Sequence, residues 1–135
     1  MQPIDQYNQL AFYTLSHKGP NFIHQHVVDA FAIQNANENT KPITIIYALV
    51  GIYLHVEKNY TGKEVQMAHV KMTKKSKVFP HINLPSNRGA IKINDILAIT
   101  APTQRDAKIH QWCVCIWEAL YDQQDSIIKL ANELL

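Results

Sequence analysis

The stretch PITIIYALVGIYLHV, residues 42–56, decides the fold class. It contains no Asp, Glu, Lys or Arg, and apolar residues occupy nearly every side of the helix that it would form. A helix without a polar face is typical of the centre of a protein core. The stretch is also shorter than the roughly 20 residues that a membrane-spanning helix needs. It therefore predicts the central helix of an all-α protein and no membrane span.

On both sides of this stretch, apolar residues recur with the period of an α-helix. Gly19-Pro20 and the polar run 35–40 separate the predicted helices, and the spacing of Thr61 and Glu64 indicates a capping box. A loop that contains proline and glycine is expected over residues 78–90. The sequence thus predicts a compact all-α bundle of five to seven helices that forms a single domain over residues 1–135. The predicted helices run over residues 4–16, 20–34, 42–57, 61–77, 94–99, 103–121 and 125–135.

Composition bounds the cellular setting and the class of protein. Of the 135 residues, 47% are hydrophobic and 18% are charged, which is enough apolar material for a core and too little charge for disorder. A formal net charge of +2 argues neither for nor against an anionic partner. Cys113 and Cys115 would point to different sides of a helix and could not bridge each other. With no signal-peptide pattern at the N-terminus, we expect a cytoplasmic protein.

Seven histidines are the most unusual feature of the composition. The predicted second helix carries His24 and His26 on opposite shoulders of its apolar side. Asp29 follows His26 by three residues, a spacing that would let the carboxylate orient that imidazole. The alternative is that both histidines lie at the edge of the core and that Asp29 lies on the surface.

The central and late helices supply the other candidates. His55 shares one arc with Thr44, Ala48 and Gly51, small residues that would let another helix approach closely. Glu57 lies on an otherwise apolar arc, where a carboxylate needs a partner, a raised pKa or access to water. On the late helix the imidazole of His110 lies beside aromatic residues. The candidate ligand-binding residues are His24, His26, Asp29, His55, Glu57 and His110.

Because these helices are expected to pack together, the sequence predicts a histidine and carboxylate pocket between them. Metal ligands within it would be His24, His26, His55 and His110, a set suited to zinc, iron, nickel or manganese as a divalent ion. The sequence contains no His-x-x-x-His, Glu-x-x-His or Cys-x-x-Cys spacing, so the alternative that each histidine has a separate place at the edge of the core or within it stays open. Whether the protein is an enzyme stays open.

Two other classes of function have a basis in the sequence. The first is an interaction module that forms a homodimer through the apolar stripe of the last helix, which consists of Ile127, Ile128, Leu130, Ala131, Leu134 and Leu135. The second is nucleic-acid binding through the lysine-rich segment Lys58–Lys77. That segment lacks interleaved arginines and aromatic residues, which favours a solvated surface instead.

Several stretches resemble an uncharacterised bacterial domain-of-unknown-function family with an IHQHVVDA(F/Y)A signature. They are FIHQHVVDAFAIQ at 22–34, LHVEK at 54–58, TGKEVQ at 61–66, RGAI at 88–91, HQW at 110–112 and VCIWEA at 114–119. The resemblance extends over most of the chain. It implies a compact bacterial protein, and it assigns no activity and no catalytic residue.

Overall fold

The computed structural model describes residues 1–17, 19, 21–75 and 78–135, and over these residues it contains seven α-helices, one 3-10 turn and no strand. This confirms the predicted all-α bundle. The second helix begins at His24, whereas Pro20, its predicted start, lies outside the described residues. The helices are α1 Pro3–Ser16, α2 His24–Asn35, α3 Pro42–Lys58, α4 Gly62–Lys75, α5 Ile93–Leu97, α6 Pro102–Ala119 and α7 Gln124–Leu134, and the turn η1 Tyr121–Gln123 joins the last two.

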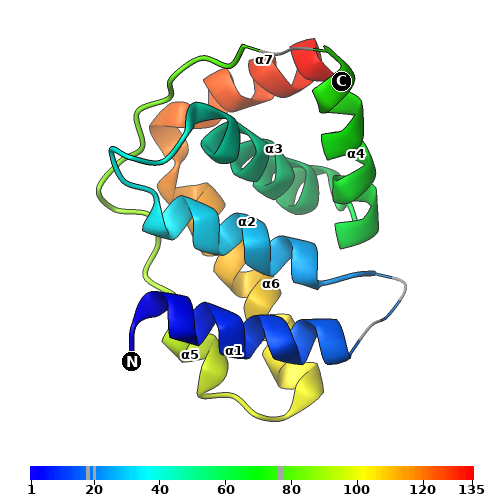
Figure 1. Cartoon of the computed structure of the whole chain (residues 1–135), viewed down its shortest axis with the longest axis vertical. Coiled ribbons are helices and arrows are strands. Elements are labelled where there is room, and N and C mark those ends of the chain that lie inside the picture. The colour runs from blue at the N-terminus through cyan, green and yellow to red at the C-terminus, as the bar shows by residue number, and fades with distance from the viewer. Residues whose placement is uncertain (18, 20, 76–77) are drawn as a thin grey trace.

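Helix α3 is the central element, as its apolar sequence predicts. It packs against α2, α4, α6 and α7, and residues on all its sides, from Ile45 to Leu54, are buried. In Figure 1 it lies between α2 and α7, with α4 alongside. Fully burying one large aliphatic side chain contributes about 1.5–3 kcal/mol, so this helix contributes much of the driving force for folding.

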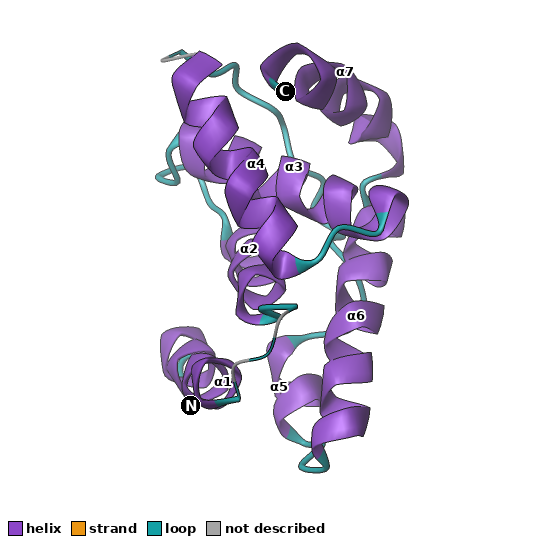
Figure 2. Cartoon of the chain, turned by 90° about the vertical axis from the view of Figure 1, so that its right-hand side faces the viewer, coloured by secondary structure: helices purple, strands orange, loops and turns teal. Residues whose placement is uncertain are grey.

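The bundle is elongated, and α2 and α6 connect its two ends. Helices α1 and α5 lie at one end and α7 at the other, while α6 runs along much of the length (Figure 2). Helix α2 contacts α1 on one side and α3, α4 and α6 on the others. Residues of α2, α3 and α6 that are far apart in the sequence therefore lie near each other.

The predicted capping box at the start of α4 is present. The backbone N–H of Glu64 donates to Oγ1 of Thr61 at 3.2 Å, and the backbone N–H of Thr61 donates to Oε1 of Glu64 at 3.0 Å. Beside it, the backbone N–H of Gly62 donates to the carbonyl of Asn21 at 2.7 Å. A β-carbon at Gly62 would overlap the carbonyl oxygen of Phe22. This contact, the 21–62 junction, joins the start of α2 to the start of α4.

The long loop before α5 is fastened to the bundle by one arginine. Arg88 donates from Nη1 to the carbonyls of Ile33 and Ala36, at 3.0 and 2.7 Å, and from Nε to the carbonyl of Pro85 at 2.7 Å. Carbonyls at the end of a helix have no partner within it, so the guanidinium satisfies the C-terminal end of α2. Phe79, Ile82 and Leu84 pack against the core, as the sequence predicts for this loop.

Much of the apolar stripe of the last helix is used within the chain. Ile127, Ala131 and Leu134 are buried, and α7 packs against α3 and α4. The surplus apolar surface on which the homodimer hypothesis rested is reduced accordingly. Cys113 and Cys115 are both free thiols. In the described part of the chain, no helix has the length and apolar character needed to cross a membrane.

Candidate functional site

Three of the predicted histidines meet at one point between α2, α3 and α6. The rings of His26 and His55 are stacked, with centroids 3.5 Å apart and an interplanar angle of 18°. Nδ1 of His110 lies 3.1 Å from Nε2 of His55, and these two rings are nearly perpendicular, at 85°. We call this group the three-histidine cluster. The small residues predicted on the arc of α3 that includes His55 permit the close approach of α2 that builds it.

The hydrogen bonds of His55 determine which of its ring nitrogens carries a proton. Nδ1 lies 2.9 Å from the carbonyl oxygen of Tyr60, and a carbonyl can only accept, so Nδ1 carries a hydrogen and donates it. Burial lowers the pKa of His55, an effect that the Tyr60 carbonyl opposes and the neighbouring His110 reinforces. In the neutral ring Nε2 is then bare and accepts a hydrogen bond from Nδ1–H of His110.

His26 lies deeper than the other two members of the cluster. It is 4% exposed, and its Nδ1 has no hydrogen-bond partner among the described residues. Burial, together with the proximity of His55 and His110, lowers its pKa to about 3. At neutral pH the imidazole is therefore uncharged, which is the state that can bind a metal or share a proton.

A small pocket of about 220 Å³ opens beside the cluster. The three histidines form one wall, and the other wall consists of the chain between α3 and α4 together with the chain before α2. Asn59 ends α3 in a left-handed conformation, with φ 61° and ψ 29°, and thereby turns Tyr60 toward His55. Asparagine tolerates this conformation, so its position after an apolar helix was an available signal that the sequence interpretation did not use. The remaining lining residues are Asn21, Ile23, Asn59, Tyr60 and Thr61.

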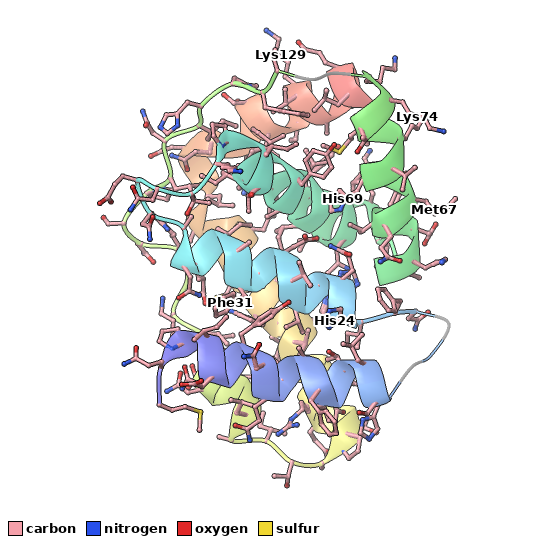
Figure 3. All side chains as sticks on the ribbon, viewed as in Figure 1. His24, Phe31, Met67, His69, Lys74 and Lys129 are labelled. Atoms are coloured by element: carbon pink, nitrogen blue, oxygen red, sulfur yellow. The ribbon has the colours of Figure 1, made fainter. Side chains whose placement is uncertain are left out.

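His24 does not belong to the cluster. Its Nδ1 lies 2.8 Å from Oγ1 of Thr14, between α1 and α2, and Figure 3 shows the labelled side chain there. Burial lowers its pKa. Helical periodicity placed His24 and His26 on different sides of α2, and α1 rather than α3 occupies the side of His24.

Asp29 is buried, but it does not orient His26 as predicted. Its Oδ1 accepts a hydrogen bond from Nε2 of Gln25 at 3.0 Å, and its Oδ2 lies against Gly51 without a hydrogen-bond partner among the described residues. Burial raises the pKa of this carboxyl well above its ordinary value, although the bond from Gln25 opposes the rise. The three-residue spacing permits a contact with His26, but the side chain of Asp29 turns toward α3 instead of toward the imidazole.

Glu57 also lies outside the cluster. Its Oε1 accepts a hydrogen bond from Nε1 of Trp117 at 2.6 Å. The carboxylate thus has an indole on α6 as a partner, and Glu57 is exposed to solvent, as its position near the end of α3 allows. The predicted pocket is therefore built from histidines without a carboxylate.

The metal and nucleic-acid predictions can be compared with these positions. No group of three or more His, Cys, Asp or Glu side chains within the described ranges is arranged to hold a metal ion. The facing pair His55 and His110 is what remains of the four predicted metal ligands. Of the lysine-rich segment, Lys77 lies outside the described residues. The other five lysines are exposed, namely Lys58, Lys63, Lys71, Lys74 and Lys75.

Comparison with protein-family models matches residues 4–121 to a family of unknown function, DUF5946. This match covers most of the chain, so the protein belongs to that family. The resemblance to a domain-of-unknown-function family is thereby confirmed. Comparisons with curated proteins and with solved structures gave no match.

Proposed function

We propose that this DUF5946 member binds one divalent transition-metal ion between His55 and His110. The observation that carries the proposal is the 3.1 Å separation of Nε2 of His55 and Nδ1 of His110. Two imidazole nitrogens bound to the same tetrahedral ion, each about 2.0–2.1 Å from it, stand about 3.3 Å apart. To bind an ion in place of the hydrogen-bonded proton, the two nitrogens would separate by a few tenths of an ångström and both rings would turn so that their lone pairs point at the ion.

The surroundings of His55 support this assignment. Histidines that bind metals almost always donate their second ring N–H to a carbonyl, a carboxylate or water, which fixes the ring and directs the bare nitrogen at the ion. Nδ1 of His55 donates to the carbonyl of Tyr60 in this way. Neutral imidazoles suit zinc, copper and nickel. His110 would move its proton from Nδ1 to Nε2, a change of tautomer that leaves its charge unaltered.

His26 would support the site without binding the ion. Because its ring is stacked parallel on His55, the in-plane lone pairs of the two rings cannot converge on one ion. It restricts the orientation of the His55 ring instead. Two protein ligands leave coordination positions open for water or for a small molecule in the adjoining pocket, and open positions are typical of metal sites that act on a ligand.

The test is metal binding by tag-free protein. Equilibrium dialysis against zinc, nickel or copper, followed by elemental analysis, should give close to one ion per chain, and the variants His55→Ala and His110→Ala should each lose it. His81→Ala is the matched control, because His81 lies in an exposed loop, where its Nε2 is 3.0 Å from Oδ1 of Asn83, and is not part of the three-histidine cluster. Binding of less than about a tenth of an equivalent by wild-type protein, or equal loss in the control, refutes the proposal.

A further inference from the structure

A second concave surface, separate from the three-histidine cluster, lies over α3 between α2 and α4. We call it the Asp29 groove; it has a volume of about 570 Å³. Gln25 and Asp29 on α2 form its polar part, and Thr44 and Ala48 on α3 form its floor. His69 closes the side toward α4, where Figure 3 shows it between α3 and α4. Its outer wall is apolar and includes Tyr47 and Phe79.

Asp29 is the unusual member of this groove. It is 2% exposed, and Oδ2 has no hydrogen-bond partner in the part of the chain that the structure describes. A buried carboxyl is normally paired, since leaving it unpaired costs several kcal/mol, on the order of 2–7 even for an uncharged polar group. Among the described residues that line the groove there is no lysine and no arginine.

Small residues of α3 lie beside the buried carboxyl of Asp29. Thr44, Ala48 and Gly51 follow one another along the side of α3 that faces α2, and Oδ2 lies directly over the bare α-carbon of Gly51. Thr44 and Ala48 are part of the groove itself. A slender ligand lying over these two residues would have its polar end at Asp29 and its body against the outer wall.

Two neighbouring groups determine which kind of ligand fits. Burial lowers the pKa of His69 and so favours its uncharged ring, an effect that the hydrogen bond of Nε2 to the carbonyl of Tyr47, at 2.8 Å, opposes. The rings of Tyr47 and Phe79 meet edge to face, with centroids 5.6 Å apart. Aromatic faces beside a single acid favour an organic cation, which the ring quadrupoles and the carboxylate both attract.

We infer that the Asp29 groove binds a small primary amine with a slender apolar body, whose ammonium group pairs with Oδ2 of Asp29. This inference does not depend on the metal site, because it involves neither His55 nor His110. Because burial raises the pKa of Asp29, pairing with the ammonium group would release the proton of the carboxyl to solvent, and Oδ1 would keep its hydrogen bond from Gln25.

The experiment uses 2-phenylethylamine as the probe and 2-phenylethanol as its uncharged analogue. Isothermal titration calorimetry on the full chain should show binding of the amine and, for the alcohol, affinity at least about tenfold weaker, the effect of one charge-assisted hydrogen bond. Asp29→Asn should weaken amine binding by a similar factor, and it should fold because it removes a buried ionisable group. Asp125→Asn, a change of the same charge at an exposed position, should bind like wild type.

NMR locates the binding site independently of the heat signal. Added amine should shift the amide resonances of Val28, Ala32 and Ala48, which line the groove. Three results would overturn the inference: no heat and no shifts at millimolar amine, equal affinity of wild type and Asp29→Asn, or shifts confined to residues outside the groove.

Discussion

The depressed pKa of His26 makes a quantitative prediction about stability in acid. In the unfolded chain this imidazole should titrate near pH 6.5, whereas in the folded chain burial and the neighbouring histidines lower its pKa to about 3. Between these values the unfolded state binds the additional proton, so the free energy of unfolding falls as the pH falls. Well below pH 6.5 each pH unit corresponds to about 1.4 kcal/mol, and at pH 6.5 to half of that, so the change from pH 6.5 to 4.5 removes about 2.3 kcal/mol.

The measurement is a series of urea unfolding curves for wild type and His26→Gln from pH 7.5 to pH 4. Asp29 has a raised pKa in the folded state, and it therefore contributes stability that increases as the pH falls. Both proteins retain Asp29, so its effect cancels in the difference between them. We expect the difference to change by about 1.4 kcal/mol per pH unit below pH 6.5, with wild type losing stability relative to the variant.

If the unfolding free energies of the two proteins changed equally with pH, His26 would protonate in the folded state as easily as in the unfolded chain. The reasoning from burial would then be wrong. NMR gives an independent check, because the ring resonances of His26 should not titrate between pH 7.5 and pH 4.

Three further substitutions test other parts of the structure. Asp29→Asn should remove the loss of stability that wild type shows as the pH rises above about 4. The unfolding free energy gained by the substitution should therefore grow by about 1.4 kcal/mol per pH unit. A gain that does not change with pH would contradict the raised pKa of Asp29. Arg88→Lys should lower the unfolding free energy in urea by about 1.5–3 kcal/mol, because one ammonium group cannot replace hydrogen bonds to three separate carbonyls. An unchanged midpoint of urea unfolding would show that these hydrogen bonds do not stabilise the fold. Gly62→Ala should lower the stability measured by thermal unfolding by about 1–3 kcal/mol, because its β-carbon would overlap the carbonyl of Phe22. Gly19→Ala is the control and should have no such effect, because the space around Gly19 is open. Equal effects of the two substitutions would contradict the overlap.

Much of the fold follows from local patterns. Apolar periodicity identified the helices, and the absence of a polar face identified α3 as central, because both properties depend only on residues close in sequence. The capping box at Thr61 and Glu64 is of the same kind. The small residues beside His55 correctly indicated a close helix neighbour, which is α2.

The site required information that local patterns do not contain. Periodicity gives the angle of a side chain around its own helix, but the neighbour at that angle depends on how the whole bundle packs. His24 therefore faces α1 and Thr14, while His26, two residues later, faces His55. The spacing of Asp29 and His26 permitted a contact, yet the space above Gly51 receives the carboxyl instead. The hydrogen bonds from Arg88 to Ile33 and Ala36 join residues more than fifty positions apart, and no local sequence pattern predicts them.

The 21–62 junction gives the small pocket beside the three histidines a built-in reporter. Asn21 lines that pocket, and so does Thr61, the neighbour of Gly62. The backbone N–H of Gly62, held by the carbonyl of Asn21, can exchange with solvent deuterium only when the two chain segments separate. The exchange rate of this single amide therefore measures how often the pocket wall opens, and an occupant that holds the wall closed would slow it without any spectroscopic label.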